Sequence, residues 1–123
     1  MQVSYSAESV LDSTISRNDL RVLLVYPNTR DVAMANLGFQ QVYSLLNKIE
    51  GVVCDRFAMP VGWKPETQRL SREELRSMDM QMHPLDFDVI AFSISFEPDY
   101  LNTVLALKYF GIPLDREERD ASF

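Results

Sequence analysis

The stretches Val22-Leu-Leu-Val-Tyr26 and Val89-Ile-Ala-Phe-Ser-Ile-Ser-Phe96 decide the fold of this 123-residue chain. Both are apolar and rich in β-branched and aromatic residues, which is typical of strands buried on both faces of a parallel sheet. Each ends at polar residues and is followed by a helical pattern, so the sequence predicts an α/β fold. Ligands of such folds bind beyond the carboxyl ends of the strands, and we therefore expect functional residues at 27–36 and 93–99.

The alternation of strand and helix patterns predicts three layers, with helices on both faces of a mainly parallel sheet of about three strands. Strands are expected at 20–26, where Pro27 ends the ladder, at 52–58 and at 86–96. The first strand is central, the second lies at one edge and the third on the other flank, in a truncated flavodoxin-like order. The fourth strand of that order is missing, so the apolar third strand should seek a partner for its open edge.

Capping signals and apolar spacing place the helices of the predicted domain. Residues 28–35 are interpreted as a polar loop, and Asn36 as the N-cap of a helix that runs to about Glu50. A last helix is expected at 97–110, with Pro98 in its first turn and Gly111 as its stop signal. The buried face of the earlier helix is predicted to consist of Val42, Leu45, Leu46 and Ile49.

Composition divides the chain and excludes several classes of partner. We expect an N-terminal arm or short helix at 1–19, a partial α/β domain at 20–114 and a charged tail at 115–123. The net charge of −6 and the pI near 4.7 argue against nucleic acid as a partner, because phosphate binding needs clustered Lys and Arg. No basic targeting region and no membrane-spanning apolar run occur, so we expect a cytoplasmic protein without a membrane segment.

Two residues with reactive side chains are interpreted as structural. Cys54 is the only cysteine, which excludes an internal disulfide and a cysteine metal site, and we expect it to be a small buried residue. His83 is the only histidine and has no second strong metal ligand nearby in the sequence. Neither a nucleophile elbow nor a phosphate-binding glycine motif occurs, so catalysis by this chain alone is not expected.

The strongest candidate site is the pair of loops beyond the first and third strands. Asn28, Thr29 and Arg30 follow the first strand, and the helix near Asn36 has no acidic residue in its first turn, so its positive dipole end could meet an anion or a carbonyl group. Alternatively, Asn28 and Thr29 only form a turn and Arg30 faces water. The hydroxyls of Ser93 and Ser95 are predicted to share one strand face, with backbone carbonyls or a bound ligand as their partners.

Two stretches carry a resemblance to a known family. Met34-Ala-Asn-Leu-Gly-Phe-Gln-Gln-Val-Tyr43, together with Phe87-Asp-Val-Ile-Ala-Phe-Ser-Ile-Ser-Phe-Glu-Pro-Asp-Tyr-Leu-Asn102 and Gly111-Ile-Pro-Leu114, resembles the N-terminal region of a radical SAM protein family. That region is similar to cobalamin-binding domains. The resemblance implies a flavodoxin-like domain followed by a barrel, in which three cysteines hold a four-iron cluster that cleaves S-adenosylmethionine.

The resemblance also implies what the chain lacks and what it could bind. The three-cysteine motif is expected beyond Phe123, so the 4Fe-4S cluster and S-adenosylmethionine would belong to the parent protein only. The D-x-H-x-x-G motif that supplies a cobalt ligand in many cobalamin domains is replaced by Pro27-Asn-Thr-Arg-Asp-Val32. If cobalamin binds, the residues implied to line the crevice are Asn28, Thr29, Arg30, Ser93 and Ser95.

Two functions follow as expectations. The first is a cobalamin-binding-like domain fragment of a radical SAM enzyme, which is not catalytic by itself. The second is a vestigial Rossmann-like interaction or scaffold module that no longer binds cobalamin. The expected partners are the downstream radical SAM barrel of the same protein and a further copy of the chain, which would pair through the exposed edge of the third strand.

Overall fold

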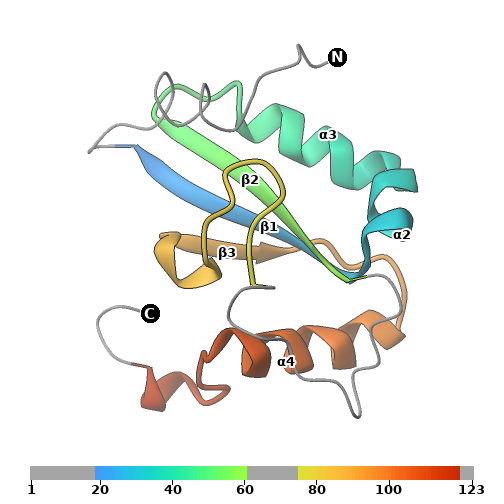
Figure 1. The fold of residues 1–123 in the computed structure, drawn as a ribbon, viewed down its shortest axis with the longest axis vertical. Helices are drawn as coiled ribbons and strands as arrows, with labels where there is room; N and C mark the ends of the chain where they lie inside the picture. Colours follow the sequence, from blue (N-terminus) through green and yellow to red (C-terminus); the bar gives the residue numbers. More distant parts are fainter. Residues whose placement is uncertain (1–18, 61–74, 120–123) are drawn as a thin grey trace.

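The computed structural model describes residues 19–60 and 75–119 as an α/β unit (Figure 1). Two short 3-10 helices, η1 (Pro84–Asp86) and η2 (Arg116–Glu118), flank the segment that contains the third strand and the last helix. No helix within the described ranges is long and apolar enough to cross a membrane. The main elements are β1 (Leu20–Thr29), α2 (Arg30–Ala35), α3 (Leu37–Leu46), β2 (Val52–Met59), β3 (Val89–Phe92) and α4 (Pro98–Phe110).

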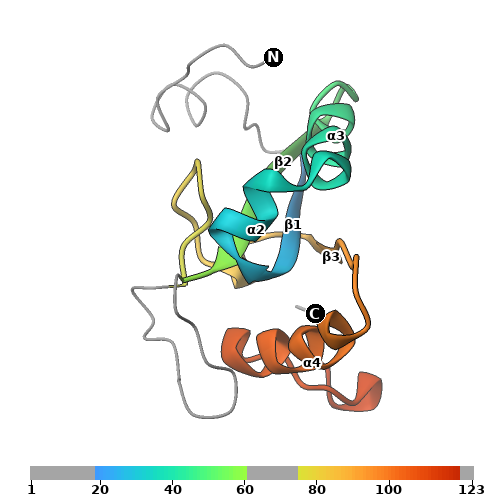
Figure 2. The ribbon, with the colours of Figure 1, turned by 90° about the vertical axis from the view of Figure 1, so that its right-hand side faces the viewer.

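The sheet has the predicted order β2-β1-β3, and both strand pairs are parallel. The central strand β1 aligns Val22 with Cys54 on one side and with Val89 on the other. Figures 1 and 2 show α2 and α3 on one face of the sheet and α4 on the opposite face. The prediction of a three-layer α/β fold with a small, flavodoxin-like parallel sheet is therefore confirmed.

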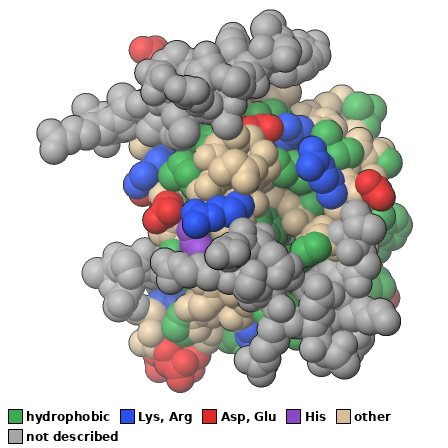
Figure 3. All heavy atoms as spheres, in the orientation of Figure 1, with side chains coloured by type: hydrophobic (Ala, Val, Ile, Leu, Met, Phe, Trp, Pro, Cys, Tyr) green, Lys and Arg blue, Asp and Glu red, His purple; other side chains and the backbone are tan. Residues whose placement is uncertain are grey.

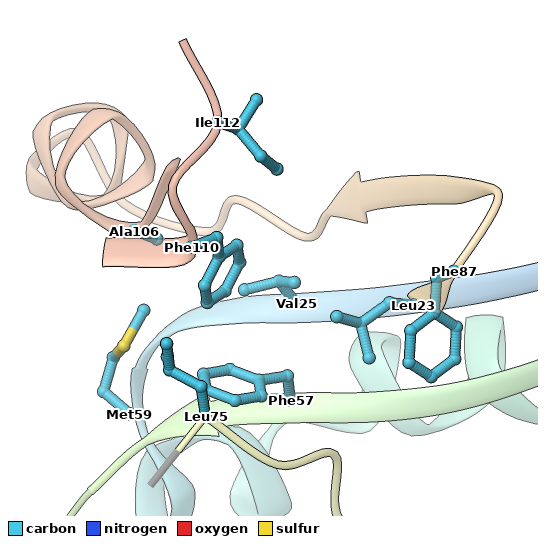
Figure 4. Close-up of a cluster of buried hydrophobic side chains, with 9 residues drawn as sticks. All are labelled: Leu23, Val25, Phe57, Met59, Leu75, Phe87, Ala106, Phe110 and Ile112. Carbon is cyan, nitrogen blue, oxygen red and sulfur yellow. The ribbon is translucent and has the colours of Figure 1, made fainter. Parts of the chain in front are cut away.

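Alternate residues of β1 fill two separate cores, because side chains alternate across a strand. Leu23 and Val25 belong to the cluster beneath α4, whereas Leu24 and Tyr26 belong to the cluster beneath α2 and α3. Figure 4 shows the first cluster, in which the rings of Phe57 and Phe110 meet edge to face with centroids 5.1 Å apart. Each such buried side chain stabilises the fold by roughly 1.5–3 kcal/mol relative to its exposed state.

The first strand is longer than predicted, and the loop expected after it is a helix. β1 continues past Pro27 to Thr29, and its register with β2 shifts between Tyr26 and Thr29. A proline at such a bulge removes no regular ladder hydrogen bond, which is why the strand can pass through it. Residues 30–35, predicted to be loop, form α2.

The prediction for the buried face of α3 is right for Leu46 and wrong for its other three residues, and the predicted N-cap is confirmed. The Asn36 side chain accepts a hydrogen bond from the Phe39 N–H at 2.9 Å, and the helix ends at Leu46 instead of near Glu50. Phe39 is fully buried and packs edge to face on Tyr26, which fixes the inward side of the helix. The inward side consists of Phe39, Tyr43 and Leu46, whereas Val42, Leu45 and Ile49 are exposed.

The third strand is shorter than predicted, and α4 begins and ends as expected. β3 spans only Val89–Phe92; η1 precedes it, and residues 93–95 are not strand, although the Ser93 N–H still donates to the Val25 carbonyl at 2.9 Å. The Asp99 carboxylate accepts hydrogen bonds from the N–H groups of Ser95 and Phe96, both at 3.2 Å, and this fixes the turn into α4. Gly111 closes α4 in the left-handed conformation with φ of 81°, which glycine adopts without steric cost.

The outer edge of β2 is covered by a segment that we call the strap, residues 77–82. The N–H of Met78 donates to the carbonyl of Arg56 at 2.8 Å, so the strap occupies part of the strand edge. Asp55 of β2 is fully buried, and its carboxylate accepts hydrogen bonds from the N–H groups of Asp79 and Met80. On the other face of the sheet, Arg56 pairs with Asp79 at 3.1 Å. Contacts on both faces of the sheet thus hold the strap against β2.

Candidate functional site

The carboxyl ends of β1 and β3 lie beside the start of α3, as the strand order predicts. Asn36 connects them, because its Nδ2 donates to Ser95 Oγ at 3.1 Å and to the Tyr26 hydroxyl at 3.4 Å. Its Oδ1 already accepts the Phe39 N–H as the cap of α3. This single side chain therefore joins the end of the central strand, the loop after β3 and the N-terminus of α3.

A cavity of about 430 Å³ lies at this junction. Tyr26 is fully buried, and Phe96, on the loop between β3 and α4, is largely exposed. The lining residues are Tyr26, Asp31, Val32, Ala35, Asn36 and Phe96. The cavity thus lies where ligands of parallel α/β sheets bind, but most of its lining is apolar and its one charged side chain is acidic.

The five residues predicted for the site lie around this cavity and do not line it. Asn28 and Thr29 are half-buried, and Asn28 Oδ1 accepts the Thr29 N–H at 2.8 Å, which is a local turn interaction. Arg30 is exposed at the first position of α2. Ser93 and Ser95 follow the end of β3, so they do not share a strand face; Ser93 is half-buried, and Ser95 is exposed and bonded to Asn36.

The electrostatics of the junction do not favour an anion. The first turn of α3 contains no acidic residue, as predicted. The Asn36 side chain, however, already accepts the Phe39 N–H, so this N–H is not available to a ligand. Asp31 lies in the first turn of α2, and Asp99 lies in the first turn of α4. On the face shown in Figure 3, Lys and Arg side chains are interspersed with Asp and Glu. A phosphate or carboxylate ligand would meet negative charge at two of the three helix starts.

The feature that sequence reasoning missed is a set of exposed apolar side chains at the starts of α2, α3 and α4 and on the loop after β3, two of which, Val32 and Phe96, line the cavity. We call this set the apolar rim. Val32 and Leu37 contribute to it from the starts of α2 and α3, and Phe96 from the loop after β3. The exposed fractions of Leu37, Phe96, Tyr100 and Leu101 are 70%, 60%, 65% and 62%. Tyr100 and Leu101 lie in the first turns of α4, whose buried residues are Asp99, Ala106 and Phe110. The rim consists of Val32, Leu37, Phe96, Tyr100 and Leu101.

Cys54 and His83, the two residues with soft metal-binding side chains, have structural contacts. No group of three His, Cys, Asp or Glu side chains in the part of the chain that the structure describes could hold a metal ion. Cys54 is buried, and burial raises the pKa of its thiol to about 12, so it stays protonated. His83 caps η1, with its Nδ1 accepting the Leu85 N–H at 3.1 Å. Cys54 is thus buried as predicted, whereas the capping role of His83 was not predicted.

Comparison with known proteins identifies one family. The family model described as the N-terminal region of radical SAM proteins matches residues 38–123, which is more than half of the chain. No curated protein and no solved structure matches the chain. The matched range contains β2, β3, α4 and all of α3 except Leu37, whereas β1, α2 and the rim residues Val32 and Leu37 precede it.

Proposed function

The chain belongs to the family of radical SAM protein N-terminal regions, and on this premise we propose that it is a non-catalytic docking module. Its apolar rim would bind the radical SAM catalytic domain of the parent protein and hold that domain in place. The observation that supports this proposal is the exposure of Leu37, Phe96, Tyr100 and Leu101 at the starts of α3 and α4 and on the loop between β3 and α4, with Phe96 also lining the cavity. Aromatic residues are enriched in the buried centres of protein interfaces relative to the rest of the surface.

The cysteine content of the chain supports assigning the radical SAM chemistry to another domain of the parent protein. A radical SAM cluster is held by cysteine thiolates, and this chain has one cysteine. That cysteine is buried within β2 with a raised pKa, so it does not fit the ligand set of a cluster. The residues of this chain therefore support a role in positioning, and no catalytic step is assigned to them.

Corrinoid binding at the rim is the second candidate function, and the strand order β2-β1-β3 favours it. In this order the crevice beside the central strand is the common ligand position. The residues present do not fit a corrinoid. The cavity lining is mainly apolar, its one charged side chain is that of Asp31, and it includes no histidine that could bind cobalt. His83 precedes β3, at the opposite end of the strand from the rim.

Titration of cobalamin with the chain distinguishes the two candidates. If the rim is a docking surface, we expect no saturable change in the absorption spectrum of cobalamin up to about 1 mM protein, which corresponds to binding weaker than about 4 kcal/mol. A saturable spectral shift at micromolar protein would instead support corrinoid binding. The variant Asn36→Ala is the control for the position of any binding. It lacks the side chain that joins Tyr26 to Ser95, so a spectral shift caused by cobalamin at the rim should weaken in this variant.

Hydrogen exchange tests the docking role itself. In the parent radical SAM protein we expect the backbone amides of residues 96–104 to exchange at least about 10-fold more slowly than in this chain alone, because docking would exclude water from the rim. The amides of α3 provide an internal control, since only its first residue, Leu37, belongs to the rim. Equal exchange of residues 96–104 in the two proteins would contradict the proposal.

A further inference from the structure

The cavity at the carboxyl ends of β1 and β3 contains a carboxylate without a partner of its own. Asp31 is exposed in the first turn of α2 and is the one charged residue among the described residues of the lining. In the part of the chain that the structure describes, Asp31 forms no ion pair and accepts no hydrogen bond, and Arg21 and Arg56 pair with Asp88 and Asp79. Its negative charge is therefore available to a ligand of the cavity.

A second polar group of the lining has an unused hydrogen-bond donor. Tyr26 is fully buried, and its hydroxyl oxygen accepts the Asn36 Nδ2 at 3.4 Å. None of the described residues accepts the proton of this hydroxyl. Buried hydroxyl groups are usually hydrogen-bonded, so the Tyr26 O–H fits a ligand that brings an acceptor oxygen. The cavity thus offers an acceptor at Asp31 and a donor at Tyr26.

The other lining residues favour a ligand with apolar and planar parts. Val32 and Ala35 are apolar residues of α2, and Phe96 contributes an aromatic ring that is 60% exposed. Arginine combines an aliphatic stem with a planar guanidinium that binds carboxylates and stacks on aromatic rings. A guanidinium is also more weakly hydrated than a lysine ammonium, so it loses less hydration in an apolar cavity. The lining therefore matches an arginine residue, whose backbone carbonyl is an acceptor for the Tyr26 proton.

The chain already contains this combination of groups at another position. The Arg56 guanidinium lies 4.1 Å from the centroid of the Tyr43 ring and pairs with Asp79 at 3.1 Å. A guanidinium held by an aromatic ring and a carboxylate is the arrangement that we expect at Phe96 and Asp31. The net charge of −6 also favours the approach of a positively charged partner surface.

We propose that the cavity binds an arginine side chain presented by the radical SAM catalytic domain of the parent protein. This inference rests on the docking role proposed above and names the chemistry by which the partner is recognised. The guanidinium would pair with Asp31 and pack on Phe96, and the aliphatic stem would lie against Val32 and Ala35. Arginine is among the residues most enriched in interface hot spots, which supports its assignment to this position.

Removing the charge of Asp31 tests the nature of the partner group. Asp31→Asn keeps the size of the side chain, and we expect it to weaken binding of the catalytic domain at least about 10-fold. The matched control is Asp86→Asn, because Asp86 is exposed in η1 at the opposite end of the sheet and its loss changes the net charge equally. Its affinity should stay within about 3-fold of the wild type. Equal losses in the two variants would contradict the inference.

Titration with N-acetyl-arginine amide tests the cavity without the catalytic domain. We expect this probe to shift the backbone amide resonances of residues 31–36 and of Phe96 saturably, with a dissociation constant of about 10 mM or below. N-acetyl-citrulline amide is the control, because a neutral urea group replaces its guanidinium, and it should cause no saturable shift. Asp31→Asn should weaken binding of the arginine probe at least about 10-fold.

The two experiments separate this inference from the docking role. If the wild type and Asp31→Asn bind the catalytic domain equally well, the docking role stands and the arginine site is wrong. If the wild type does not bind that domain, the docking role is wrong, and the arginine site loses its assignment to that domain. Equal shifts by the two probes, or no saturable shift by the arginine probe up to about 100 mM, would overturn the guanidinium site itself.

Discussion

Replacing Asp55 by alanine is expected to lower the free energy of unfolding by roughly 3–5 kcal/mol. The carboxylate is fully buried and accepts hydrogen bonds from the N–H groups of Arg56, Asp79 and Met80. Alanine would leave these donors without an acceptor, and each buried unsatisfied group costs about 1–3 kcal/mol. Chemical denaturation measures the loss. The matched control is Asp88→Ala, which removes an exposed carboxylate with one backbone donor and should change stability by about 1 kcal/mol at most.

The pH dependence of the same residue gives this prediction a second readout. Burial raises the pKa of Asp55, although hydrogen bonds from Ser77 and from the Met80 and Arg56 N–H groups act in the opposite direction. The folded protein then holds this proton to higher pH than the unfolded chain does, so stability falls as pH rises from the ordinary pKa through the raised one. Asp55→Asn should remove this slope. The assignment would be contradicted if the stability of the wild type rose with pH over that range and Asp55→Asn removed that rise.

The strands and the layer order could be predicted because they depend on local pattern. Val22–Tyr26 and Val89–Phe92 are apolar enough to require cover on both faces, and a parallel sheet provides that cover. Asn36 and Gly111 are end signals that act within one turn of a helix, and both were identified from the sequence. These features need no knowledge of the rest of the chain.

The inward face of α3 and the apolar rim could not be predicted, because tertiary contacts decide them. The sequence of α3 contains two apolar stripes, and the contact of Phe39 with Tyr26 selects the stripe that faces the sheet. Tyr100 and Leu101 fit a helical apolar pattern, but α4 lies with Ala106 and Phe110 against β1 and leaves them exposed. Periodicity identifies an apolar face, whereas packing determines whether this chain or a partner covers it.

The second large effect is expected at the rim. Phe96→Asp combined with Leu101→Asp places two charges on the proposed docking surface, where both side chains are mostly exposed in this chain. If they are interface anchors, each should cost at least about 2 kcal/mol of binding free energy, which is about 30-fold in affinity. Stability of the chain itself should change little, because exposed positions usually contribute within about 0.5 kcal/mol.

The dissociation constant between this chain and the radical SAM catalytic domain of its parent protein tests the docking role most directly. We expect measurable binding for the wild type and a loss of at least about 900-fold, or about 4 kcal/mol, for the Phe96→Asp, Leu101→Asp variant. Leu45→Asp is the control, because Leu45 is 61% exposed on the outer side of α3, away from the rim. Its affinity should equal that of the wild type. No binding by the wild type, or equal loss in Leu45→Asp, would contradict the role proposed for the rim.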